Sequence, residues 1–141
     1  MTPVRTVVLD NEAVQALLDV GHPKNRRALA VIEAVASRNE RRAGTVRLVV
    51  PTSVRVEAGW VRRAPRAAAI NRLRFDDLVL DAETADTAAR IRAALPLSVA
   101  DAHLAATLGG MPGPHAVVTS DAGDTAAIAR HLGLPLRTLV I

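Results

Sequence analysis

The sequence predicts an α/β fold in which helices cover both faces of a mainly parallel sheet. Short apolar runs alternate with long alanine-rich stretches of helical periodicity along the 141 residues. Within the apolar runs, polar residues do not alternate with apolar ones, which is typical of parallel strands buried on both faces. We therefore expect a three-layer α/β/α architecture, with residues 1–141 forming one domain.

The chain begins with a strand followed by two helices. Residues 6–10 form a buried apolar strand, and residues 11–20 form a helix with alanine, valine and leucine on one face, ended by a glycine. Pro23 begins the next helix, because proline suits the first turn. This helix runs to about residue 40 and ends in a basic loop at residues 38–44.

A second strand and a short helical region follow. Residues 47–50 form the strand, which Pro51 ends. Thr52 or Ser53 then caps a helix, because hydroxyl side chains accept hydrogen bonds from the first free backbone N–H groups. Pro65 breaks that helix and begins another.

The rest of the chain continues the alternation of strands and helices. Further strands are expected at residues 78–80, 116–119 and 138–141. Further helices are expected at residues 82–95, at residues 98–109 with Ser98 as the cap, and at residues 122–132. Proline or glycine follows each of these helices, which is a common stop signal.

Composition excludes several classes of function. The absence of cysteine removes disulfides, thiolate nucleophiles and cysteine zinc sites, and fits a cytoplasmic protein. The absence of an apolar stretch near ~20 residues predicts no membrane association. Trp60 and Phe75 are the sole large rings, too few for a platform that stacks single-stranded bases. Any contact with nucleic acid should therefore be mainly electrostatic.

Charge is distributed unevenly along the chain. Residues 22–74 carry thirteen Lys or Arg against three acids, whereas residues 75–124 carry eight acids against two arginines. This division could place a polyanion over an acidic centre, and the arginines expected to contact it are Arg55, Arg62, Arg63, Arg66, Arg72 and Arg74. The alternative is that these arginines only solvate helices.

Four carboxylates stand alone among aliphatic residues, each where a strand ends or a helix begins. They are Asp10, Glu57, Asp101 and Asp121. In a parallel α/β sheet, ligand sites form beyond the carboxyl ends of the strands, so we expect the four side chains to converge there. Clustered like charges are costly unless a cation neutralises them, and oxygen ligands suit a hard divalent ion such as Mg²⁺ or Mn²⁺.

With these acids in this order, the chain resembles PIN-domain ribonucleases, and in particular the VapC-type toxins of toxin–antitoxin pairs. The resemblance covers essentially the whole chain. It is carried by Asp10 after Val-Leu, by Glu57 in the helix after the second strand, by Asp101 in Ala-Asp-Ala-His-Leu-Ala-Ala, and by Asp121 in Thr-Ser-Asp-Ala-Gly-Asp. Where the family often has Ser or Thr soon after the first acid, this chain has Asn11.

The resemblance implies a Mg²⁺- or Mn²⁺-dependent endoribonuclease with a PIN-like fold, blocked by a cognate antitoxin, with a homodimer as the expected assembly. Asp10 and Asp101 are the first metal ligands, Asp121 completes the set, and Glu57 either binds metal or orients the attacking water. Asn11 and Asp124 are expected beside the ligands. Metal-assisted hydrolysis needs no Ser, Cys or His nucleophile, which agrees with this set.

Simpler interpretations of the same residues remain open. Asp10 and Asp121 could be helix N-caps, and Glu57 could pair with Arg55 or Arg62 on a solvated face. The four histidines show no metal-ligand spacing and are expected on loops and on the surface.

Other functions also remain open. One is a PIN nuclease of RNA maturation without an antitoxin, and another is a non-catalytic RNA-binding module. A phospho-receiver domain would gather acids at strand ends too, but it needs a lysine late in the chain, and the sole lysine is Lys24.

Overall fold

The computed structural model describes residues 4–43 and 46–141. Within these residues, five strands form one sheet in the order β3-β2-β1-β4-β5, and every neighbouring pair is parallel. The strands are β1 (Thr6–Leu9), β2 (Arg47–Pro51), β3 (Asp76–Leu78), β4 (His115–Thr119) and β5 (Leu136–Val140). The expectation of a parallel sheet is confirmed.

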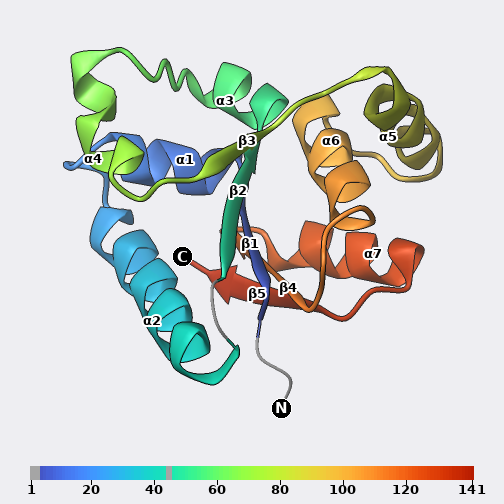
Figure 1. The fold of residues 1–141 in the computed structure, drawn as a ribbon. Helices are drawn as coiled ribbons and strands as arrows, with labels where there is room; N and C mark the ends of the chain where they lie inside the picture. The colour runs from blue at the N-terminus through green and yellow to red at the C-terminus, as the bar shows by residue number, and fades with distance from the viewer. Residues whose placement is uncertain (1–3, 44–45) are drawn as a thin grey trace.

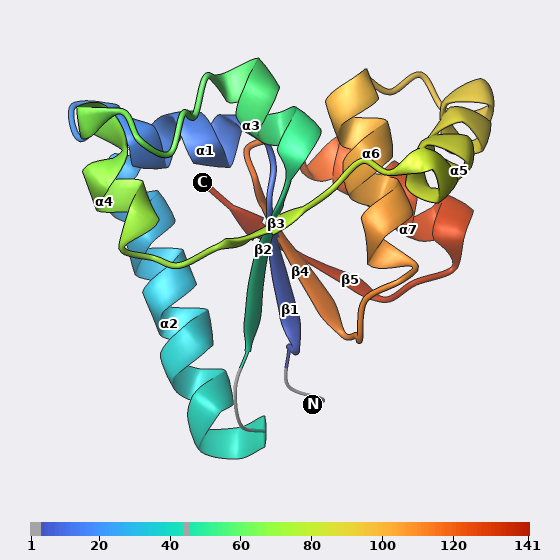
Figure 2. The same cartoon turned by 45° about the horizontal axis from the view of Figure 1, so that its top comes forward.

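Helices connect the strands and cover both faces of the sheet (Figure 1). They are α1 (Asn11–Leu18), α2 (Asn25–Ala43), α3 (Thr52–Ala58), the 3₁₀ turn η1 (Pro65–Ala67), α4 (Ala68–Asn71), α5 (Ala82–Ala94), α6 (Val99–Leu108) and α7 (Ala122–Leu132). Figure 2 shows the sheet between α1, α2 and α4 on one side and α5, α6 and α7 on the other. None of the helices in the described ranges has both the length and the apolar composition needed to cross a bilayer.

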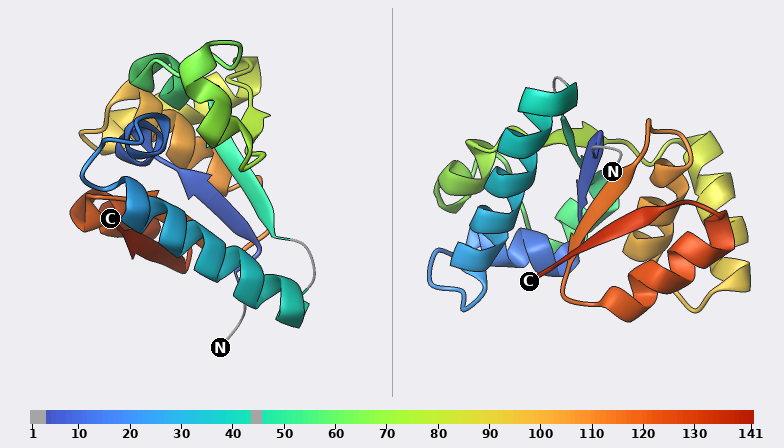
Figure 3. Two further views of the ribbon diagram at one scale, coloured as in Figure 1. Left: turned by 90° about the vertical axis from the view of Figure 1, so that its left-hand side faces the viewer. Right: turned by 90° about the horizontal axis from the view of Figure 1, so that it is seen from below.

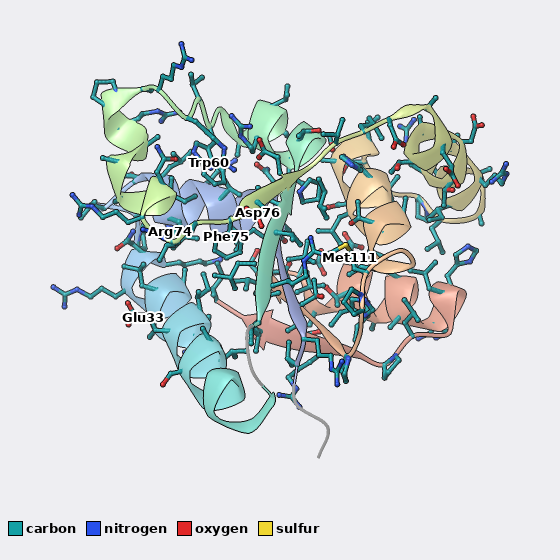
Figure 4. The ribbon with its side chains drawn as sticks, in the orientation of Figure 1. Glu33, Trp60, Arg74, Phe75, Asp76 and Met111 are labelled. Atoms are coloured by element: carbon teal, nitrogen blue, oxygen red, sulfur yellow. The ribbon has the colours of Figure 1, made fainter. Side chains whose placement is uncertain are left out.

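The strands bury both of their faces, which accounts for the unbroken apolar runs in the sequence. In β1, Val7 and Leu9 belong to the core under α1, α2 and α4, whereas Val8 belongs to the core under α5, α6 and α7. Trp60 and Phe75, each 2% exposed, lie in the first of these cores (Figure 4). The protein therefore has the expected three-layer α/β/α architecture.

Some element boundaries differ from those expected. Helix α2 continues as helix through residues 38–43, where a loop was expected, while Gly44 of that loop lies outside the described residues. Pro51 belongs to β2 and precedes α3 without a side-chain cap, so neither Thr52 nor Ser53 is the cap. The third strand lies two residues earlier than expected, because Asp76, Asp77 and Leu78 pair with β2, whereas the strand was expected at residues 78–80.

The strand order creates a crevice at the carboxyl edge of the sheet. From β1 the chain proceeds to β2 and β3 on one side, and β4 and β5 lie on the other side (Figures 1 and 3). Ligand sites of open parallel sheets form where the order reverses in this way. Here that point is the end of β1 and β4, where Asp10 N–H donates to Val118 O at 3.2 Å.

Candidate active site

A cleft of about 190 Å³ lies at this edge of the sheet. Six of its lining residues are acids: Asp10, Glu12, Glu57, Asp101, Asp121 and Asp124. Its other polar residues are Asn11, Thr119, Ser120 and Thr125, and its apolar lining comes from Leu104, Val117 and Ile128. The structure thus brings together all four acids predicted from sequence, together with Asn11 and Asp124.

Asp10 is both a helix cap and part of the cleft. Its Oδ1 accepts a hydrogen bond from Ala13 N–H at 2.9 Å, which confirms the N-cap interpretation. This cap is compatible with a role of the same carboxylate in metal binding. Burial raises the pKa of Asp10 to about 6, and the charges of Asp101 and Glu12 add to the rise, while hydrogen bonds from Thr119 and Ala13 oppose it. A cation bound nearby would lower this raised pKa, because it favours the ionised form of the Asp10 carboxyl group.

Asp101 stands in the first turn of α6, and the expected cap of that helix is confirmed. Ser98 Oγ accepts a hydrogen bond from Asp101 N–H at 3.1 Å, so the Asp101 carboxylate is not needed as a cap. Burial raises the pKa of Asp101, and the negative charges of Asp124, Glu57 and Asp121 raise it further. This repulsion shows that the acids share one electrostatic environment.

Asp121 and Asp124 form the start of α7. Asp121 caps the helix by accepting a hydrogen bond from Asp124 N–H at 3.1 Å, so the cap interpretation holds here as well. The N–H group of Asp121 donates to Thr119 Oγ1 at 2.9 Å, which fixes the turn after β4. Partial burial and the charge of Asp121 raise the pKa of Asp124, as expected of two acids one helical turn apart.

Glu57 is an exposed residue of α3 at the rim of the cleft, and it does not form the ion pair proposed as its alternative role. Arg55 and Arg62 instead bind the two carboxylate oxygens of Asp77, each at 2.7 Å. Glu57 lines the cleft, and its charge raises the pKa of Asp101. The acid is therefore placed for a role in the cleft.

Two of the polar cleft residues that sequence reasoning missed are Thr119 and Glu12. Thr119 is buried at the end of β4 and hydrogen-bonds both to the Asp121 N–H group and to the Asp10 carboxylate. Glu12 Oε1 lies 3.4 Å from Lys24 Nζ and 4.0 Å from His22 Nε2, so the Lys24 ammonium group partly balances its charge. Two sequence signals could have identified these residues. Thr119 is a hydroxyl residue that ends an apolar strand, and Glu12 is a second acid shortly after Asp10.

The expectation that the histidines are surface residues is wrong for two of them. His103 is fully buried and His115 is 3% exposed. His103 Nδ1 lies 2.6 Å from Ser53 Oγ, and His115 Nε2 lies 2.8 Å from the carbonyl oxygen of Met111. A neutral imidazole can be buried when a ring nitrogen finds such a partner, and burial lowers the pKa of His103.

The six arginines expected to contact a polyanion divide into two groups. Arg55 and Arg62 hold Asp77 and stack on Trp60, with their Cζ atoms 5.4 and 4.4 Å from the ring centroid. These two side chains are therefore engaged in stabilising the fold. The other four are exposed at the surface: Arg63, Arg66, Arg72 and Arg74. Of these, Arg66 donates to the carbonyl oxygen of Gly59 at 2.6 Å.

The donor chemistry of the cleft suits a hard divalent cation. All its strong donors are oxygens, and neither histidine nor cysteine lines it. Across residues 4–43 and 46–141, no three His, Cys, Asp or Glu side chains stand in metal-coordinating geometry. Binding a cation would therefore require the carboxylates, which repel one another, to turn toward it.

Asp10 makes the stability of the metal-free fold depend on pH. Because its folded-state pKa of about 6 lies above the ordinary 3.8, the folded protein binds more protons than the unfolded chain between these values. The free energy of unfolding should therefore fall as pH rises through this window, by at most about 3 kcal/mol, and level off above it. In EDTA, the Asp10→Asn variant, which keeps a capping side chain, should match wild type near pH 4 and exceed it at pH 7.5. Denaturant unfolding at both pH values measures this, and parallel curves for the two proteins would contradict it.

Comparison with known proteins supports the fold assignment. No protein-family model matches the sequence, and no curated protein matches it in sequence. A chain in the crystal structure of VapBC2 from Rickettsia felis bound to a DNA fragment from their promoter has a similar structure, with a TM-score of 0.59 and 12% sequence identity. The match covers 94% of this chain and 98% of that chain. It confirms the three-layer, PIN-like fold expected from the sequence.

Proposed function

We propose that the protein is a metal-dependent endoribonuclease that acts as the toxin of a toxin–antitoxin pair. One observation carries the proposal: Asp10, Glu57, Asp101 and Asp121 come from four separate segments and line one cleft at the reversal point of the sheet. A structural protein gains nothing from gathering like charges in this way, since the repulsion between them costs stability. A nuclease uses them to hold a cation.

Asp10 and Asp101 would hold the cation, with Asp121 completing the set. Mg²⁺ or Mn²⁺ bound there would neutralise charge at the scissile phosphate and lower the pKa of a water molecule. The hydrogen bond from Thr119 would keep the Asp10 carboxylate in place, and because Ser98 caps α6, the Asp101 carboxylate is not needed as a cap. Glu57, an exposed residue that lines the cleft, would orient the attacking water or join the ligands.

Incubation with total RNA tests the proposal. Cleavage should require Mg²⁺ or Mn²⁺, should stop in EDTA, and should create new ends at defined positions when the products are mapped. Cleavage that persists undiminished in EDTA would remove the metal-dependent mechanism. Activity restricted to one precursor, in a genome without an adjacent antitoxin gene, would favour the RNA-maturation alternative.

The four surface arginines outside the Asp77 cluster are expected to bind part of the RNA backbone. Replacing Arg63, Arg66, Arg72 and Arg74 together with glutamine should make the dependence of binding on salt shallower. Each phosphate that is no longer neutralised should reduce the steepness of log K against log salt by about 0.7. Binding of a single-stranded RNA by the Asp101→Asn variant, measured at several salt concentrations, gives the slope without cleavage.

A paired replacement of Arg90 and Arg130, exposed arginines on α5 and α7, is the control for loss of charge alone. It should leave the slope nearly unchanged. A slope unaffected by the fourfold replacement would assign those arginines to solvation or to the antitoxin surface. Arg55 and Arg62 are left intact, because replacing them would release Asp77.

An antitoxin is the proposed partner, because the similar solved structure is a VapBC complex. A hollow between the ends of α1 and α3, lined by Leu18, Ala58 and Arg66 among others, offers a place for a helix or extended segment. The Trp60 ring is buried and does not line this hollow. Co-expression with the product of an adjacent small gene should suppress cleavage. The homodimer stays a prediction, which the molecular mass of the purified protein in solution would test.

The strand order argues against a phospho-receiver domain. Receivers of the flavodoxin-like type have the order 2-1-3-4-5, whereas this sheet has the order 3-2-1-4-5. The sole lysine, Lys24, lies near Glu12 rather than near the carboxyl end of a late strand. The acids of this cleft therefore do not fit phosphoryl acceptance.

A further inference from the structure

One side-chain hydrogen bond joins the two helices that carry Glu57 and Asp101. Ser53 Oγ on α3 lies 2.6 Å from His103 Nδ1 on α6, a pair fifty residues apart in the sequence. The imidazole is fully buried, and the serine is half-buried. A short bond in this setting resists separation of the helices, because breaking it would leave polar atoms without a partner in the interior.

Both partners are closely linked to the acids of the cleft. Ser53 precedes Glu57 by four residues, so the two side chains share one face of α3. Both line an apolar hollow beside Val56 and Val99, and Glu57 lines the acidic cleft as well. His103 follows Asp101 by two residues, which directs it away from the cleft and toward α3 within the same turn of α6.

Helix α3 depends on such contacts to a greater degree than α1 and α6, the two helices that pack against it and have side-chain caps. It has seven residues, no side-chain cap at its start, and Val54 as its buried residue. Helices this short are marginal without tertiary contacts. A shift of α3 relative to α6 would move Glu57 relative to Asp101, because each acid sits within one turn or so of the hydrogen-bonded pair.

We propose that Ser53 and His103 are positioning residues, whose hydrogen bond fixes the separation of Glu57 and Asp101 across the cleft and thereby its affinity for a divalent cation. The inference rests on the proposed function, since it takes the cleft to bind that cation. Neither residue touches the reacting atoms. Their effect passes through the placement of α3 on α6.

Manganese affinity, measured by calorimetry on the full-length protein, is the first test. Ser53→Ala should weaken binding by about 10-fold, the low end of the loss seen when outer hydrogen-bond partners of metal sites are removed. Ser53→Thr, which keeps the hydroxyl, should restore affinity to within about 2-fold of wild type. The double variant Ser53→Ala with His103→Leu should bind no more weakly than the weaker single variant, because both remove the same bond.

The control removes partly buried hydrogen bonds away from the cleft. Trp60 Nε1 donates to Asn71 Oδ1 at 3.0 Å, Asn71 Nδ2 donates to the carbonyl oxygen of Arg62 at 2.7 Å, and Asn71→Leu removes both bonds. It should lower stability without changing manganese affinity. Equal losses of affinity in Asn71→Leu and Ser53→Ala would show that general destabilisation is responsible, and would overturn the positioning role.

Amide hydrogen exchange without metal tests the same inference independently of cation binding. In Ser53→Ala, amides of α3 should exchange about 5-fold faster, the factor expected from losing one ordinary hydrogen bond, while those of α7 stay unchanged. Wild-type protection of α3 in Ser53→Ala would overturn the proposal. Failure of the wild-type protein to bind Mn²⁺ would instead contradict the proposed function, and the exchange rates would still decide whether Ser53 and His103 position α3.

Discussion

Replacing Asp101 with asparagine is expected to reduce RNA cleavage by more than about 100-fold, beyond the loss typical of an outer hydrogen-bond partner. The change removes an anionic oxygen from the cleft without changing side-chain size. It also spares the cap of α6, because Ser98 supplies that hydrogen bond. Asp10→Asn should have a comparable effect, since asparagine can still cap α1 but carries no charge.

The measurement is the initial rate of cleavage of a defined RNA at saturating Mg²⁺, with circular dichroism to establish folding. Asp86→Asn on α5 is the matched control, because Asp86 is an exposed acid that does not line the cleft. It should cleave at the wild-type rate. A wild-type rate in Asp101→Asn or in Asp10→Asn would remove that residue from the catalytic set.

The second large effect is expected in thermal unfolding. A divalent ion that binds only the folded state adds about 2.7 kcal/mol at a hundredfold excess over Kd, which for a chain of this size is on the order of 5–10 °C in Tm. Wild type should therefore gain several degrees on adding Mn²⁺. Asp101→Asn should start from a higher Tm in EDTA, since repulsion from Asp124, Glu57 and Asp121 is relieved, and should gain less from Mn²⁺.

Matched ionic strength is essential, because salt alone weakens repulsion between the acids. Mg²⁺ at the same ionic strength gives a second divalent ion, and Asp86→Asn should show the wild-type gain. Equal gains in wild type and Asp101→Asn would place Asp101 outside the metal site. No gain in either protein would count against the clustered-acid model itself.

Local signals in the sequence were sufficient where a single feature decides the structure. The helix expected at residues 122–132 is α7 (Ala122–Leu132), because Asp121 and Gly133 mark its ends. Ser98 was expected to cap α6 and does so. Asp10, Asp101 and Asp121 could be assigned to one site because strand ends and helix starts place them at one edge of the sheet. Glu57 reaches the same cleft from the last turn of α3.

Features that depend on tertiary contacts could not be read from the sequence. Strand β3 begins at Asp76, an exposed acid that local propensity disfavours, because its register is set by pairing with Val49 of β2. Arg55 and Arg62 were expected to contact a polyanion, and their ion pairs with Asp77 and their packing on Trp60 were not foreseen. Asp77 lies too far along the chain from either arginine for helical or strand periodicity to indicate the contact.

The orientation of the helices divides the four acids unequally. Asp10, Asp101 and Asp121 stand at the starts of α1, α6 and α7, where the partial positive charge of a helix N-terminus stabilises an anion. Glu57 is the second-to-last residue of α3, where the helix dipole has the opposite sign. The backbone thus stabilises three of the charges and opposes the fourth. Glu57 is consequently the acid that depends most on a bound cation to turn its carboxylate into the cleft. The position of the Glu57 side chain should therefore report most directly whether the cation is bound.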